Sequence, residues 1–114
     1  MIKRKEAMRL RVRNNISGGT GTIKDLNIFE PEEMLGKSNL FSKFFISPAC
    51  SIGLHAHTDD AAIYYLLEGE LIVSQNGEDY ILHEGDAVFT ANGDSHGLAN
   101  QSEKQAVMLA IIFS

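Results

Sequence analysis

Two histidines separated by a single residue are the side chains in this chain best suited to chemistry. His55 and His57 lie in the segment Gly53-Leu54-His55-Ala56-His57, and a third histidine, His96, follows about forty positions later. Alternate residues of a β-strand face the same side, so both imidazoles of the pair would point one way. A lone histidine on a strand is more often a packing residue. A pair with a third histidine on a later strand favours a metal or catalytic site, because imidazole is the commonest protein ligand for metals.

The elements that must position these histidines are short strands joined by turns. Asn76-Gly77 between two alternating segments predicts a β-hairpin. No long helical pattern interrupts the series, which favours an all-β sandwich or barrel that fills residues 1–114 as one domain. The expected strands are residues 8–13, 23–29, 39–46, 51–57, 62–67, 71–75, 78–82, 87–90, 95–100 and 105–113.

Composition narrows the class of protein. A chain of 114 residues is long enough to enclose a core without cross-links. Its one cysteine, Cys50, allows no internal disulfide and fits a reducing cytoplasm. The first residues are charged rather than apolar, and no apolar run is long enough to span a bilayer. We therefore expect a cytoplasmic protein with no membrane partner.

The net charge of −5 is unevenly distributed. Residues 1–13 hold six of the ten basic residues and one acidic residue, whereas the remainder holds four basic and fourteen acidic residues. Residues 8–13 alternate apolar and basic, which predicts a half-buried strand. Without a DNA-reading helix, this basic arm is expected to lie on its own acidic body or on a partner subunit, and no nucleic-acid partner is predicted.

Residues 49–100 carry two spaced sets of residues: Ala49, His55, His57, Ala62 and Gly69, then Gly85, Ala91, Gly93, His96 and Asn100. They resemble the two motifs of the cupin family, Gly-x5-His-x-His-x3/4-Glu-x6-Gly and Gly-x5-Pro-x-Gly-x2-His-x3-Asn. Fifteen residues separate Gly69 from Gly85, as in compact members of that family. The resemblance implies a double-stranded β-helix, also called a jelly-roll or cupin barrel. It also implies that His55, His57 and His96 are metal ligands for a divalent transition ion (Fe, Mn, Ni, Zn or Cu).

One ligand of the family pattern is missing, because Ala62 occupies the position of the glutamate in the first motif. Three neutral imidazoles can still hold an ion and leave positions open, and the uncompensated charge would favour an anionic ligand. Asp59 and Asp60 could reach the ion from a loop in place of the glutamate, although a solvated acidic turn is the more ordinary interpretation.

The remaining candidates have weaker signals. Alternation along residues 62–67 places Tyr64 on the inner face, where its hydroxyl could orient a ligand or serve in catalysis, or where its ring could simply pack. His83 is expected at the surface, and Cys50 is expected to be buried and to point away from the histidines. Packing roles are predicted for the aromatic residues Phe44, Phe45 and Phe89.

Two functions remain open from the sequence. The first is a metal-dependent enzyme of the dioxygenase, isomerase or decarboxylase type that acts on a small polar or anionic molecule. The second is a non-catalytic module that binds or senses such a molecule, with or without a metal. The exposed edge strands of a small barrel also predict a homodimer whose interface includes the N-terminal strand.

Overall fold

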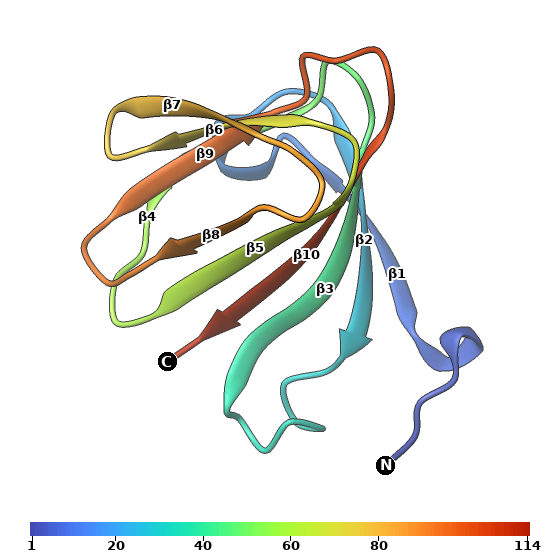
Figure 1. The fold of residues 1–114 in the computed structure, drawn as a ribbon. Helices are drawn as coiled ribbons and strands as arrows, with labels where there is room; N and C mark the ends of the chain where they lie inside the picture. The colour runs from blue at the N-terminus through green and yellow to red at the C-terminus, as the bar shows by residue number, and fades with distance from the viewer.

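The chain folds into two antiparallel sheets that face each other, as seen in the computed structural model, which describes residues 1–114 (Figure 1). The six-stranded sheet has the order β1 (Arg9–Asn14), β2 (Thr22–Phe29), β3 (Ser38–Ile46), β10 (Ala106–Phe113), β5 (Ala61–Glu68) and β8 (Ala87–Thr90). The four-stranded sheet has the order β4 (Ser51–Ala56), β9 (Ser95–Ala99), β6 (Leu71–Gln75) and β7 (Glu78–Leu82). Two 3-10 turns, η1 (Lys5–Ala7) and η2 (Ile16–Gly18), flank β1. The predicted double-stranded β-helix is confirmed, and each predicted strand agrees with the structure to within one residue at either end.

The core lies between the sheets and is built from alternate residues of both. Thirteen buried apolar side chains form one cluster, with Phe44 and Met108 contributed by the six-stranded sheet and Val73 and Leu98 by the four-stranded sheet. On β5, Ala62, Tyr64 and Leu66 are buried while Tyr65 and Leu67 are exposed, as the alternation predicts. The inner face of β5 therefore points into the barrel.

The predicted hairpin joins β6 and β7. Asn76 and Gly77 have φ angles of 51° and 85°, so both central residues are left-handed, as a type I′ turn requires. The paired residues Gln75 and Glu78 close the turn. This hairpin sets the register between β6 and β7, and β6 in turn pairs with β9, which carries His96.

The N-terminal arm lies on the chain's own acidic residues. Arg9 is paired with Glu30 at 2.8 Å, and Arg11 and Arg13 both reach the buried carboxylate of Asp25. β1 is the edge strand of the six-stranded sheet and pairs with β2, and these side-chain contacts add to that pairing. The arm was predicted to lie on its own acidic body or on a partner subunit, and within the chain it takes the first of these positions.

The connection from β1 to β2 packs unusually closely on the histidine strand. A Cβ atom at Gly53 would lie 2.0 Å from the carbonyl oxygen of Ser17, and one at Gly19 would lie 2.3 Å from that of Ser51. Neither glycine has a positive φ angle, so their small size, not backbone freedom, is what this packing requires. The connection is thus part of the wall around β4.

Two of the packing predictions need correction. Phe89 is 57 % exposed, because it lies on the outer face of the edge strand β8 opposite Ile63. Cys50 is only partly buried; its thiol lies 3.6 Å from the carbonyl oxygen of Thr22 and faces away from the histidines, as predicted. His83 is exposed at the surface, as expected. No helix in the structure is long and apolar enough to cross a membrane.

Candidate metal centre

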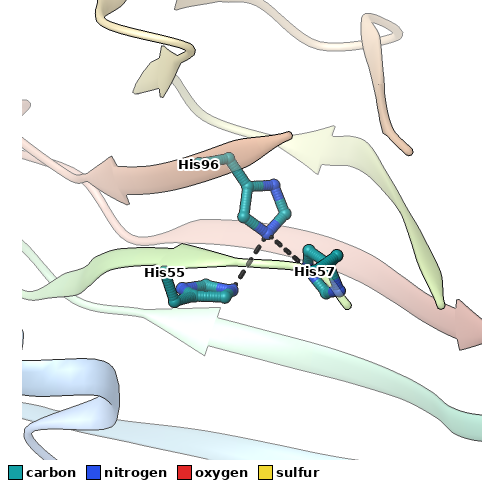
Figure 2. A group of neighbouring side chains, drawn as sticks. All are labelled: His55, His57 and His96. Atoms are coloured by element: carbon teal, nitrogen blue, oxygen red, sulfur yellow. Dashed lines mark hydrogen bonds between the residues drawn. The ribbon is translucent and has the colours of Figure 1, made fainter. Parts of the chain in front are cut away.

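The three histidines predicted as ligands meet inside the barrel. His55 on β4 is the direct strand partner of His96 on β9. His57 follows the end of β4 and is held by backbone hydrogen bonds to the loop before β9, from its own N–H to Asp94 and from the N–H of Gly93 to its carbonyl. One nitrogen from each ring falls within 4.8 Å of the others, and Figure 2 shows the rings turned toward a common point. The three residues are positioned to bind a metal ion.

The outer nitrogen of each ring is committed to a hydrogen bond, which determines the tautomer. Nδ1 of His55 lies 2.8 Å from the carbonyl oxygen of Gly53, which can only accept a hydrogen bond. Nδ1 of His57 lies 2.8 Å from Oδ1 of Asp60, which as a carboxylate also only accepts. In the neutral form of both rings the proton is therefore on Nδ1, which leaves a lone pair on Nε2.

The tautomer of His96 is determined by a longer chain of hydrogen bonds. The side-chain amide of Gln75 donates to the carbonyl of Phe89 at 3.0 Å, which turns its oxygen toward Thr90. The Thr90 hydroxyl donates to that oxygen at 2.9 Å, and its own oxygen lies 2.7 Å from Nδ1 of His96. A hydroxyl has one proton, so Thr90 must accept from His96, and Nε2 of His96 also keeps a lone pair.

The Nε2 atoms of the three rings therefore converge, and in the neutral rings each carries a lone pair. Nε2 of His96 lies 2.9 Å from Nε2 of His57 and 3.0 Å from Nε2 of His55, the two contacts dashed in Figure 2. Burial, followed by the neighbouring His55 and His57, lowers the pKa of His96 to about 4, so this ring is neutral at neutral pH. Lone pairs at these distances repel one another unless a proton or a metal ion lies between them. Metal–nitrogen bonds of about 2.0–2.1 Å in a tetrahedral site separate nitrogens by roughly 3.3 Å, close to the two distances from His96, whereas the three nitrogens as a set lie within 4.8 Å of one another.

The position of the missing glutamate is filled by a buried alanine, and no other carboxylate takes its place. Ala62 is 1 % exposed and lies between Thr90 and Ile112 in the six-stranded sheet. Asp60 reaches His57 only at Nδ1, the nitrogen on the side of the ring away from the other histidines. Asp59 is exposed, and its side chain forms no hydrogen bond or ion pair with a histidine. Asp60 therefore orients a histidine and does not take the place of the glutamate.

Tyr64 lies against the histidine cluster. Its ring stacks on that of His96, with centroids 4.6 Å apart and an interplanar angle of 11°, and its hydroxyl lies 3.2 Å from Nε2 of His96. Burial raises the pKa of Tyr64 above its usual range, so the hydroxyl keeps its proton beside that nitrogen. The inner position predicted for Tyr64 is confirmed, and it brings a hydrogen-bond donor to the site.

A small cavity of about 200 Å³ opens beside His55, His57 and Tyr64. Its walls are largely apolar, and Arg13 is the charged residue that lines it apart from the histidines. The sequence did not identify Arg13 as a residue of the cavity wall, or Thr90 and Gln75 as residues that orient His96. The signal for Arg13 was its alternation with Arg11, which puts both guanidinium groups on the inner face of β1, but alternation alone does not say what that face meets.

Comparison with known proteins agrees with this geometry. A family model described as "Cupin domain" matches residues 43–112. The oxalate-binding protein of Thermotoga maritima is 35% identical over 99 residues, which are 87% of this chain and 82% of that protein. The crystal structure of a predicted oxalate decarboxylase from Thermotoga maritima has a TM-score of 0.93 at 33% identity, over 99% of this chain and 98% of that one. The protein TT1209 from Thermus thermophilus shares the fold, with a TM-score of 0.74 at 24% identity over 98% and 95% of the two chains. The chain belongs to the cupin family.

Proposed function

We propose that this cupin holds one divalent transition ion through His55, His57 and His96 and binds a small organic anion at that ion. The observation that carries the proposal is the convergence of three Nε2 lone pairs whose tautomers are set by their hydrogen-bond partners. A histidine cluster retained only for packing would not need to turn three Nε2 atoms toward one point. Fixing the outer nitrogen in this way is typical of metal-ligating histidines.

The charge of the site supports an anionic ligand. Three neutral imidazoles leave the full charge of a divalent ion uncompensated, and Ala62 contributes no carboxylate. The cavity is smaller than the roughly 300–1,000 Å³ pockets that hold drug-sized molecules, at about 200 Å³. The Thermotoga maritima relatives are named for oxalate, a small dianion. We therefore propose a ligand of the small carboxylate class.

Whether the bound anion is also transformed is a second question, and Tyr64 favours a reaction. When bound, the ion would act as a Lewis acid on a coordinated carboxylate. Tyr64 supplies a protonated hydroxyl beside the ligand position and could orient the anion or move a proton. Against turnover, no aspartate or glutamate lines the cavity. Anion binding is thus the primary proposal, and a metal-dependent decarboxylase, dioxygenase or isomerase activity is the second.

A homodimer belongs to the same proposal. The outer face of the six-stranded sheet exposes large apolar side chains on three of its strands, β1, β5 and β8: Leu10, Val12, Tyr65, Leu67 and Phe89. Exposed apolar side chains gathered on one face often mark an interface. A second copy that packs on this sheet would cover it, and β1 would be part of the interface.

Two measurements test the proposed function. Elemental analysis of protein purified without added metal should find about one divalent ion per chain, and a His55→Ala/His57→Ala variant should lose it. Calorimetric titration of the metal-loaded protein should detect oxalate binding, and mass spectrometry of the same mixture should detect any product. Full metal occupancy in the double variant would overturn the assignment of the ligands. A folded wild-type protein that takes up no metal would leave only a metal-free binding module.

A further inference from the structure

The two inner arginines of β1 share a single carboxylate inside the barrel. Arg11 donates to Oδ2 of Asp25 at 2.6 Å, and Arg13 donates to the same oxygen at 3.3 Å. Asp25 is fully buried, whereas the side chains of Arg11 and Arg13 are 34 % and 37 % exposed. Two guanidinium groups on one carboxylate leave one positive charge in excess, and the longer bond makes Arg13 the more weakly held of the two.

Arg13 is also the arginine that reaches the cavity. It lines the same space as His55 and His57 but comes from the six-stranded sheet, whereas those histidines come from the end of β4 in the four-stranded sheet. Its single hydrogen bond to Asp25 uses one of five N–H donors, which leaves the others for a ligand. The rest of the lining offers no second cation apart from the histidine cluster: Ile16, Ser17, Leu40, Phe44, Ile52 and Ile112.

We infer that Arg13 binds the second carboxylate of a small dicarboxylate whose first carboxylate is held at the metal ion. This inference rests on the proposed function and specifies its ligand. A guanidinium group binds a carboxylate through two parallel hydrogen bonds, and it does so most strongly where water is scarce. A monocarboxylate would satisfy the ion alone. A dicarboxylate would also neutralise the excess charge of the Arg11–Asp25–Arg13 cluster, so the site selects the dianion.

The test compares a dicarboxylate with a monocarboxylate in matched variants. Zn²⁺-loaded wild-type, Arg13→Gln and Arg9→Gln proteins are titrated calorimetrically with oxalate and with formate. Loss of charged hydrogen bonds in Arg13→Gln should weaken oxalate binding about ten- to hundredfold. Formate binding and zinc content should stay unchanged. Arg9→Gln removes a charge from the same strand at a residue paired with Glu30 outside the cavity, and it should behave as the wild type.

Each alternative gives a different result. If both carboxylates of oxalate chelate the ion, oxalate affinity in Arg13→Gln will stay within twofold of the wild type, which overturns this inference alone. If Arg13 serves only to hold Asp25, oxalate and formate affinities will fall together, with the same consequence. If Arg13→Gln does not fold, Arg13→Lys keeps the charge without the planar fork and should still lower the ratio of oxalate to formate affinity. A wild-type protein that binds zinc but neither anion would overturn the proposed function itself.

Discussion

Asp60 is the most direct place to test how the histidine cluster is organised. Its Oδ1 accepts a hydrogen bond from Nδ1 of His57 at 2.8 Å, while His57 is 5% exposed and Asp60 is 25% exposed at the side chain. Asp60→Ala removes the acceptor that keeps the proton on Nδ1. His57 can then place its proton on Nε2, where it blocks metal binding, and its lone pair becomes less basic.

The expected loss of metal affinity in Asp60→Ala lies at the lower end of the range for hydrogen-bond partners of metal-ligating histidines. Removing an outer hydrogen-bond partner of a ligating histidine costs about 10- to 100-fold in metal affinity. Water can reach Asp60 because its side chain is partly exposed, so it partly replaces the lost acceptor. We therefore expect a loss of about ten- to thirtyfold, or roughly 1.4–2 kcal/mol of binding free energy. Competition with a chromophoric chelator for Zn²⁺ measures this difference directly.

Asp59 offers a matched control. Asp59→Ala removes the same charge one residue earlier, but the Asp59 side chain makes no hydrogen bond to a histidine. Its metal affinity should stay within about twofold of the wild type. Equal losses in the two variants would show that net negative charge, not the hydrogen bond to His57, matters. An Asp60→Ala protein with unchanged affinity would refute the tautomer argument.

Four further predictions concern the same centre and its surroundings. His57→Ala should remove most of the metal affinity in the chelator assay, because two imidazoles make a much weaker site; retention of tight binding would contradict the assignment. Ala62→Glu should tighten metal binding by supplying a fourth ligand. In the metal-free protein it should lower the free energy of unfolding by several kcal/mol, because Ala62 is 1 % exposed and the new carboxylate would be buried without a partner. Unchanged or weaker metal binding in a folded variant would contradict this prediction. The pKa of His96 is lowered to about 4, so between about pH 6.5 and 4 the unfolded chain binds a proton that the folded chain does not. The free energy of unfolding of the metal-free protein, measured with urea, should therefore fall by up to about 3 kcal/mol as the pH falls through that window. His96→Gln should lose this part of the pH dependence, and an equal pH dependence in the two proteins would refute the prediction. Full-length protein should be a dimer by light scattering at micromolar concentration, and deletion of residues 1–13 should weaken the dimer; a full-length monomer would exclude it.

The features that depend on local spacing could be predicted from the sequence. The two-residue separation of His55 and His57, the turn at Asn76-Gly77 and the alternation along β5 each act over a few residues, and all agree with the structure. The sequence also shows that alanine replaces the motif glutamate at Ala62. It does not show that this alanine is buried in the sheet.

The features that depend on which strands become neighbours could not be predicted. The sequence allows Asp60 as a metal ligand, whereas a turn in the loop before β5 directs it to the outer nitrogen of His57. The aromatic ring of Phe89 predicts packing, but the edge position of β8 leaves its outer face uncovered within the chain. Arg13 enters the cavity only because β1 pairs with β2 at the rim of the larger sheet.

The hydrogen bonds that orient His96 cross from one sheet to the other. Gln75 is on β6 of the four-stranded sheet, and Thr90 is on β8 of the six-stranded sheet. If the two sheets separated here, the Thr90 hydroxyl would be free to rotate and donate to Nδ1 of His96, which would move the ring proton to Nε2 and close that nitrogen to a metal. We therefore expect a chain whose two sheets have not yet packed together to bind a metal ion more weakly than the folded barrel.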